Sequence, residues 1–304
     1  MSKIFGDGIG NWQIHLGASA TLVLALAQAW IAPVTPCWED LPIGHENSPE
    51  DESIINTEYN AAIPFLLGFF ISIDILSCAS TRSSHFLELD HKFILERSGI
   101  RLENLTGCEN WAIVFIFEIS LLDKWKRDLE TTHQLNIIEL GKRGSQIEER
   151  LQQRLASINE CLIGSFSGYT SGLFPTYTCT EITRVFAFSA MTYLHVVISG
   201  DNPELPEIKK SVSNTVDAFK SLTDAKLLRH LAWPFCVSGC LALNEHHADF
   251  QDLAFAAEIT EYTVGACLEA FKIVKKCWGV RRTGSNDCDW TSVMESQDRF
   301  ILLV

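Results

Sequence analysis

Apolar positions along the chain recur at helical spacing, and no stretch alternates apolar and polar residues over several positions as a half-buried strand does. The segment 206–222 shows this most clearly, because its apolar residues follow one another at intervals of four, four and three. These residues are Ile208, Val212, Val216 and Phe219. Such spacing puts them on one face of an amphipathic helix that has one side to bury.

The segment 230–240, HLAWPFCVSGC, has a different pattern, since it is nearly free of charge and apolar all round. A short run of this kind is typical of a helix buried on every side. Pro234 lacks a backbone N–H, so we expect it to kink this helix or to mark a new helix that starts just before it. The pattern therefore predicts a central buried helix, spanning 227–243, around which the others pack.

Applied to the whole chain, the same criteria predict a succession of helices separated by polar or Gly- and Pro-containing segments. The predicted helices cover 11–30, 61–80, 108–129, 141–162, 180–199, 206–222, 227–243 and 246–271, with apolar residues at 273–278 after the last. Polar loops are expected at 37–60 and 283–288, and a Gly/Ser-rich loop joint at 164–179. The tail ends in Phe-Ile-Leu-Leu-Val, which predicts a C-terminus tucked into the core. The prediction is an all-α fold, one domain over 1–304 with about a dozen antiparallel helices around a central buried pocket.

Composition supports a large core and argues against a nucleic-acid partner and against disulfides. Of 304 residues 47% are hydrophobic, including 18 Phe and 8 Trp, which is ample material for such a core. The net charge of −14 repels phosphate backbones, so no direct nucleic-acid partner is expected. Ten cysteines occur singly without any C-x-x-C, which favours free buried thiols in a reducing compartment.

Three uncharged or apolar stretches resemble membrane segments but are better explained as buried helices. The stretch 16–34 has no positively charged region before it, as a signal peptide requires. The stretch 61–79 contains Pro64 and Asp74, and 111–122 is too short to span a bilayer. We therefore expect no membrane partner.

The order of several short motifs resembles the regulatory domain of fungal zinc-cluster transcription factors, in its acriflavine-sensitivity-type branch. The motifs that carry the resemblance are Trp-Gln-Ile-His-Leu at 12–16, Pro-Phe-Leu-Leu-Gly-Phe-Phe at 64–70, 107–125, Tyr-Leu-His at 193–195, Leu-Ala-Trp-Pro-Phe-x-x-x-Gly-Cys at 231–240, and Asp289-Trp290. The resemblance runs over essentially the whole chain. It implies a helical domain that senses a metabolite or binds another protein.

One departure from the family pattern shapes the expected function. Such regulators carry an N-terminal cluster of six cysteines in two C-x-x-C-x6-C arrays, and this chain has no counterpart. The resemblance therefore implies a regulatory module without its DNA-binding reader.

Motifs for nucleotides, metals and nucleophilic catalysis are missing from the sequence. It contains no P-loop, no G-x-S-x-G and no H-E-x-x-H, and Asn-Glu-His-His at 244–247 lacks further ligands at suitable spacing. We accordingly predict no cofactor and no metal site.

Asp74 and Glu118 are the most conspicuous candidates for chemistry, because each is a lone carboxylate in an apolar helix. A buried carboxylate must be paired, hydrogen-bonded or protonated, and a neutral one can donate a proton to a ligand. A structural role at a helix contact is the favoured interpretation. His15 and His195 also lie in apolar runs, where a single histidine is usually a satisfied core residue.

Aromatic and apolar residues that are core by default can also line a ligand cavity between helices. The candidates are Trp12, Phe65, Phe69, Trp111, Phe186, Tyr193, Trp233 and Cys236.

Two functions follow from these observations. The first is a cofactor-free cyclase or isomerase, such as a Diels–Alderase of a fungal secondary-metabolite pathway, in which Asp74, Glu118, His15 and His195 supply the catalytic groups. It would act on an apolar small molecule, in the cytoplasm, as a monomer or a homodimer. The second is a non-enzymatic, nuclear regulator that binds a metabolite or a partner protein. The first is our sequence-based hypothesis and the second its alternative.

Overall fold

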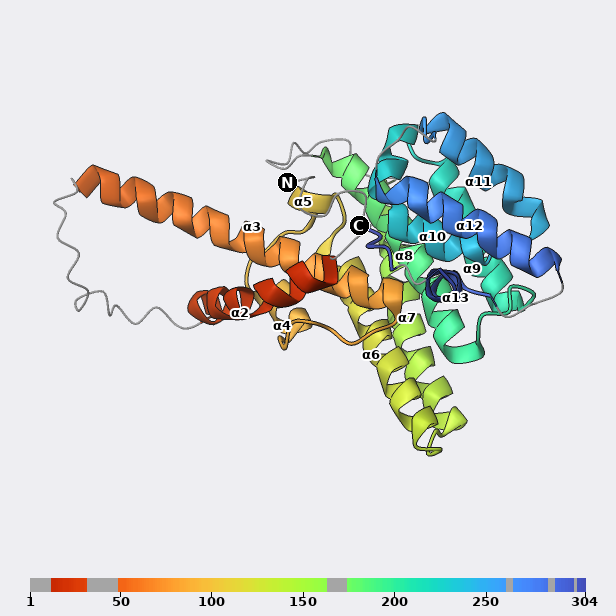
Figure 1. Ribbon diagram of the computed structural model, residues 1–304. Coiled ribbons are helices and arrows are strands. Elements are labelled where there is room, and N and C mark those ends of the chain that lie inside the picture. Colours follow the sequence, from red (N-terminus) through yellow and green to blue (C-terminus); the bar gives the residue numbers. More distant parts are fainter. Residues whose placement is uncertain (1–11, 32–48, 163–173, 261–264, 284–287, 298–299) are drawn as a thin grey trace.

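The computed structural model describes residues 12–31, 49–162, 174–260, 265–283, 288–297 and 300–304. Across these segments the regular structure is helical and no strand occurs, which confirms the all-α prediction (Figure 1). The helices are α2 (Trp12–Ile31), α3 (Pro49–Thr81), α4 (His91–Arg97), α5 (Glu103–Thr106), α6 (Asn110–Thr131), α7 (Ile137–Leu162), α8 (Thr176–Ser199), α9 (Pro206–Lys220), the 3-10 helix η1 (Ala225–His230), α10 (Ala232–Cys240), α11 (Asn244–Ala256), α12 (Ala266–Arg282) and α13 (Trp290–Glu295).

Helices α8 and α10 form the centre of the fold. Helix α8 contacts α6, α7, α9 and α10, and α10 contacts α8, α9, α12 and α13. All nine residues of α10 are buried, as its uncharged sequence predicts. Pro234 is the third residue of α10, in the first turn, where a missing N–H breaks no helical hydrogen bond. The predicted helix start just before the proline is thus confirmed.

An aromatic cluster joins α8 to α10. The Trp233 ring, which is fully buried, lies parallel to Phe186 at a centroid distance of 6.2 Å and meets Tyr193 edge-on at 6.0 Å. On the other side of α10, Phe235 contacts Phe250 edge-on at 5.2 Å. Rings that bury this much area without solvent gaps contribute strongly to core stability.

Helices α6 and α7 contact one another and extend together away from the body, as predicted for an antiparallel pair (Figure 1). Helix α7 also packs on α8, where Gly144 faces Ile198 so closely that a Cβ at Gly144 would overlap the Ile198 side chain. The small residue therefore sets how near α7 approaches the centre.

The two ends of the described chain meet in a second, smaller core beside α3. Trp12 and Leu16 of α2 pack with Ile73 and Leu302. The Trp12 indole Nε1 donates a hydrogen bond to the Phe300 carbonyl at 3.1 Å. The predicted burial of the C-terminal apolar tail is confirmed.

Three predicted boundaries were wrong. Helix α3 begins at Pro49, so 49–60 is helical although it lacks apolar periodicity; 37–48 lie outside the described residues. The expected helix 246–271 is two helices: α11 ends at Ala256, just before a positive φ at Glu258, and α12 starts after Gly265, which also has positive φ; 261–264 lie outside the described residues. The central segment 227–243 is interrupted at Leu231, where η1 gives way to α10.

The loop joint predicted at 164–179 is partly testable. Residues 176–179 belong to α8, so that part of the prediction was wrong, and 163–173 lie outside the described residues.

Two segments are long and apolar enough to cross a membrane by length and composition, Ala62–Thr81 and Thr176–Ser199. In the fold 67% and 78% of their most apolar windows are buried inside the structure. For the first segment this agrees with the interpretation of 61–79 as a buried helix; the second was not among the stretches considered in the sequence.

Candidate functional site

The first site is built around Asp74, which lies in the C-terminal, apolar part of α3 and is fully buried. After α3 the chain reverses at Arg82, a residue with positive φ, and runs back along the helix. The returning backbone brings the Phe86 N–H to Oδ1 of Asp74 at 2.8 Å and the Leu87 N–H to Oδ2 at 3.3 Å. The predicted satisfaction of this carboxylate by structural hydrogen bonds is confirmed.

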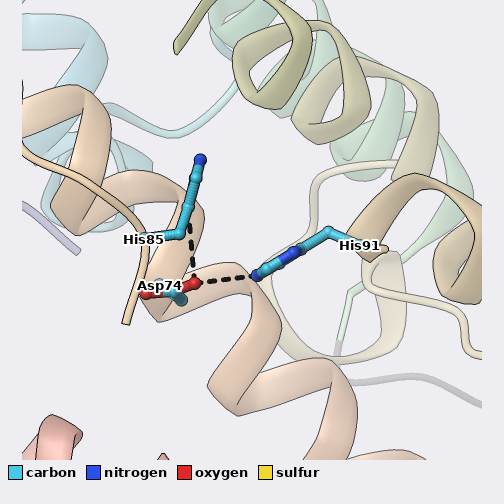
Figure 2. Close-up of side chains that lie close together, drawn as sticks. All are labelled: Asp74, His85 and His91. Carbon is cyan, nitrogen blue, oxygen red and sulfur yellow. Dashed lines mark hydrogen bonds and ion pairs between the residues drawn. The ribbon is translucent and has the colours of Figure 1, made fainter. Parts of the chain in front are cut away.

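Two histidines converge on the same carboxylate oxygen, as Figure 2 shows. Nε2 of His91, at the start of α4, lies 2.8 Å from Oδ2 of Asp74, and Nδ1 of His85 lies 3.3 Å from it. The two imidazole rings are 5.1 Å apart, and both contact the Phe117 ring of α6. We call Asp74, His85 and His91 the histidine cluster.

Each ring has a fixed partner on its other nitrogen. The Nδ1 atom of His91 lies 2.7 Å from the Leu89 carbonyl, and Nε2 of His85 lies 3.0 Å from the Ser120 hydroxyl. Ser120 in turn donates to the Phe117 carbonyl at 2.8 Å. These contacts set the ring orientations and tie the loop before α4 to α6.

Burial raises the cost of ionising Asp74, but the hydrogen bonds and charges of His85 and His91 outweigh it and lower the pKa of this carboxyl to about 2. Asp74 is therefore an ionised carboxylate at neutral pH. This differs from the neutral proton donor that the catalytic hypothesis needed.

The second site surrounds Glu118 on α6. Its carboxylate accepts from Lys92 Nζ of α4 at 2.6 Å and from Arg150 Nη2 of α7 at 2.5 Å. Burial opposes ionisation, yet Arg150 and Lys92 outweigh it, so the pKa of Glu118 is lowered. The sequence suggested a lone carboxylate within the apolar core, and this was wrong. Glu118 is ion-paired and joins α4, α6 and α7.

An open groove of about 880 Å³ runs between α4, α5, α6 and α7, and a second of about 590 Å³ adjoins it along α6 and α7. Glu118 and Arg150 line both grooves, so their ion pair lies at the boundary between them. The larger groove mixes rings and charges, including Lys92, Trp111, Phe115, Glu118, Arg150 and Arg154. The Arg150 guanidinium also lies over the Phe115 ring, 5.4 Å from its centroid. We call the larger one the Glu118 groove.

The remaining predicted site residues are distributed over the fold and do not meet in either groove. Trp111 lines the Glu118 groove, whereas Phe186, Tyr193 and Trp233 form the aromatic core. Cys236 is buried in α10, and burial raises the pKa of its thiol. Trp12 and Phe69 belong to the small core beside α3. Phe65 is 42% exposed.

The two other histidines behave differently from one another. His15 is exposed on α2, so its interpretation as a core residue was wrong. His195 is buried on α8, as expected, with Nε2 3.6 Å from Glu148.

Sequence reasoning missed His85, His91, Lys92 and Arg150 as partners of the two carboxylates. The two histidines fall in a segment without periodicity, and Lys92 and Arg150 look like ordinary charged residues on helix surfaces. The available signal was that Asp74 and Glu118 have no charged partner on their own apolar stretches, so each required a partner from another part of the chain.

Comparison with known proteins identifies the fold's relatives. The chain matches the fungal specific transcription factor domain over residues 1–304. It belongs to this family. The resemblance inferred from the short motifs is therefore confirmed. No solved structure matches.

The relatives of this chain are named as transcription regulators, several of them of biosynthetic pathways or clusters. The chain is 31% identical to the trichothecene biosynthesis transcription regulator TRI10 of Trichoderma arundinaceum, over 97% of this chain and 69% of the relative. It is 30% identical to TRI10 of Fusarium sporotrichioides, over 97% and 68%. The ustiloxin B cluster transcription factor ustR of Aspergillus flavus is 29% identical over 96% of this chain and 51% of its own length.

These relatives overturn the cyclase hypothesis. Family and relatives are transcription regulators, so the prediction of a cofactor-free enzyme was wrong, and with it the assignment of catalytic roles to Asp74, Glu118, His15 and His195. The hypothesis rested on the missing cysteine arrays, and likeness over the whole regulatory domain is the stronger observation. The secondary-metabolite setting agrees with the names of the relatives, and the cytoplasmic location has no support.

Proposed function

We propose that this chain is the regulatory domain of a nuclear transcription regulator that controls a secondary-metabolite gene cluster. The observation that carries the proposal is the family match over the whole chain, together with relatives named as regulators of such clusters. The net charge of −14 opposes contact with a phosphate backbone, so the role assigned to this domain is regulation and not DNA recognition.

Within this function the Glu118 groove is the proposed effector site. Its volume of about 880 Å³ falls within the range of about 300–1,000 Å³ that small-molecule sites occupy. Trp111 and Phe115 offer apolar contact, and the Lys92–Glu118–Arg150 ion pairs offer charge. A small molecule with an apolar body and one ionised group satisfies both kinds of lining.

Such a ligand has a direct way to change the domain's shape. Its ionised group exchanges with one member of the ion pairs that hold α4 and α7 to α6. Helix α7 also packs on α8, so a shift of α7 changes the packing at the centre of the fold. A ligand shifts the conformational equilibrium only by its difference in affinity for the two states, and this exchange supplies such a difference.

The function is tested by deleting the gene in its host and measuring transcripts of the adjacent biosynthetic genes together with their metabolites. We expect these transcripts to change by tenfold or more in either direction. Unchanged transcripts with accumulation of one precursor would instead mark a missing enzymatic step and end the proposal.

The groove is tested by complementing that deletion with single variants. Glu118→Gln removes the shared charge, whereas Asp128→Asn removes a carboxylate from an exposed pair with Lys124 on the same helix, outside the groove. We expect Asp128→Asn to restore transcript levels and Glu118→Gln to fail at equal protein abundance. Full restoration by both variants would remove the effector site from this groove and leave the regulatory function standing.

A further inference from the structure

We propose that the histidine cluster is a zinc site, in which Oδ2 of Asp74, Nδ1 of His85 and Nε2 of His91 bind one Zn²⁺ ion. Ligand atoms of these three residues lie within 4.8 Å of one another. Imidazole nitrogen and carboxylate oxygen are both regular zinc ligands, and three protein ligands with one open position make a common site. This inference is independent of the proposed function, and it revises our sequence-based expectation of no metal site.

The hydrogen atoms on His91 give the first argument. The Leu89 carbonyl accepts only, so Nδ1 of His91 carries the proton that bridges their 2.7 Å contact. Nε2, the other nitrogen of this ring, then faces Oδ2 of Asp74 at 2.8 Å and presents a lone pair to it when unprotonated. Two acceptors at this distance need a positive charge between them, either a proton or a metal ion.

The position of the hydrogen on His85 follows from the same reasoning. The Ser120 hydroxyl hydrogen is directed to the Phe117 carbonyl, so the Ser120 oxygen accepts from Nε2–H of His85. Nδ1 of His85 then points its lone pair at Oδ2 of Asp74, 3.3 Å away, and makes no hydrogen bond. The cluster thus has two nitrogen lone pairs and one carboxylate oxygen that face a common point.

Protons alone satisfy this arrangement poorly. One proton on Nε2 of His91 satisfies the 2.8 Å contact with Asp74 but leaves Nδ1 of His85 without a hydrogen bond. Protonating both rings would bury two imidazolium ions, with ring centroids 5.1 Å apart, against a single carboxylate. Other charged groups near α3 do not help, because the Arg82 guanidinium is already paired with Asp123 at 2.6 Å and reaches Asp289 at 3.3 Å. One divalent cation satisfies both nitrogens and the oxygen together.

The two separations that involve Asp74 are close to those around a tetrahedral ion. Zinc bonds of about 2.0–2.1 Å at tetrahedral angles place ligand atoms about 3.3 Å apart. The His85–Asp74 separation already has this value, and the His91–Asp74 separation of 2.8 Å needs to open by about half an ångström to reach it.

Hydrogen bonds to neighbouring groups orient all three ligands. The Leu89 carbonyl and the Ser120 hydroxyl hold the outer nitrogens of the two rings, and the Phe86 N–H holds Oδ1 of Asp74. Metal-binding histidines almost always have such an outer partner. The ion would therefore fasten the loop before α4 to both α3 and α6.

The test is titration of the full chain, stripped with a chelator, with Zn²⁺ by calorimetry, and with Co²⁺ by visible absorption. We expect one equivalent of Zn²⁺ and the absorption bands of tetrahedral Co²⁺. The His85→Gln variant removes one ligand but leaves the Asp74–His91 contact and the backbone hydrogen bonds of Asp74 in place. We expect it to lose more affinity than the tenfold to hundredfold that removal of a second-shell partner costs.

Two further variants sharpen the test. Ser120→Ala keeps all three ligands and removes only the acceptor for His85, so we expect a loss of about tenfold to hundredfold. His246→Gln is the matched control, because His246 also contacts an aspartate, Asp249 at 2.9 Å, without a second histidine ligand. Its affinity should equal that of the wild type.

The inference is overturned if the folded wild type takes up no zinc, which would make the cluster a purely ionic one. It is also overturned if His85→Gln and Ser120→Ala both bind zinc as the wild type does. Circular dichroism of each variant separates loss of metal from loss of fold, and Ser120→Ala alone decides the matter if His85→Gln is unfolded.

Discussion

The centre of the molecule, α8 with α10, and its edge, where α4, α6 and α7 meet, are held together by opposite means. Trp233 at the centre is enclosed by rings, and Nε1 of its indole has no hydrogen-bond partner among the described residues. Glu118 at the edge is held by Lys92 and Arg150 beside an open groove. Apolar contacts at the centre give stability, whereas exchangeable ion pairs at the edge leave room for a ligand to compete. If the Glu118 groove is the effector site proposed above, stability and regulation lie in different parts of the domain.

The largest expected effect is on the centre. Trp233→Ala leaves a cavity between Phe186 and Tyr193 and should lower the free energy of unfolding by about 3–5 kcal/mol. Equilibrium urea denaturation followed by circular dichroism measures this. Trp233→Phe keeps a ring and removes the unpartnered N–H, so it should cost less than the alanine variant. A loss below about 1 kcal/mol for Trp233→Ala would contradict the view that the centre carries the stability.

Two glycines give the next largest contrast between centre and edge. A Cβ at Gly239 of α10 would lie 2.8 Å from Val274 and 3.2 Å from the Phe250 ring. Gly239→Ala should therefore destabilise the fold by about 1–3 kcal/mol through overpacking, which outweighs the gain of up to about 1 kcal/mol in helix propensity.

Gly141 on α7 is the matched position at the edge, because a Cβ there meets nothing within 4 Å. Gly141→Ala should gain helix propensity without a clash and raise the free energy of unfolding by up to about 1 kcal/mol. Opposite signs for the two variants in the same urea experiment support the contrast. The same sign for both would break it.

The smallest expected effect concerns Glu118 and depends on pH. Its pKa in the folded state is lowered from 4.5, so its ion pairs stabilise the fold fully above that value and lose this contribution as pH falls through the lower, folded-state pKa. Glu118→Gln should cost about 0.5 kcal/mol at pH 7, since Lys92 and Arg150 are 39% and 47% exposed and solvent screens their charges. The difference from wild type should vanish in acid denaturation below the folded-state pKa. A difference that persists there would mean that packing, not charge, holds this residue.

The centre of the molecule was easier to predict from the sequence than its edge. The centre was predictable because burial leaves a local signature: α10 lacks charge, and Pro234 marks its start. The edge was not, because Glu118 has mostly apolar neighbours along α6, and its charged partners come from α4 and α7. Only the packing of the helices reveals that Glu118 faces outwards.

The histidine cluster was predictable in one part only. A carboxylate in the C-terminal, apolar part of α3 had to be satisfied, and it is. Its partners His85 and His91 follow a chain reversal at Arg82, and no periodicity in that loop indicates which way their rings turn. Likewise, the start of α3 at Pro49 was missed because helix formation there does not depend on an apolar face.

The contact between Trp12 and Phe300 has a topological consequence. It joins residues 288 positions apart, so it closes one of the largest loops that this chain can form. Cutting the chain at an exposed turn elsewhere and joining these neighbouring ends with a short linker should leave the fold intact, which makes the domain a candidate for circular permutation. Removing α2 would expose Leu302, and removing residues 300–304 would expose Trp12 and Leu16.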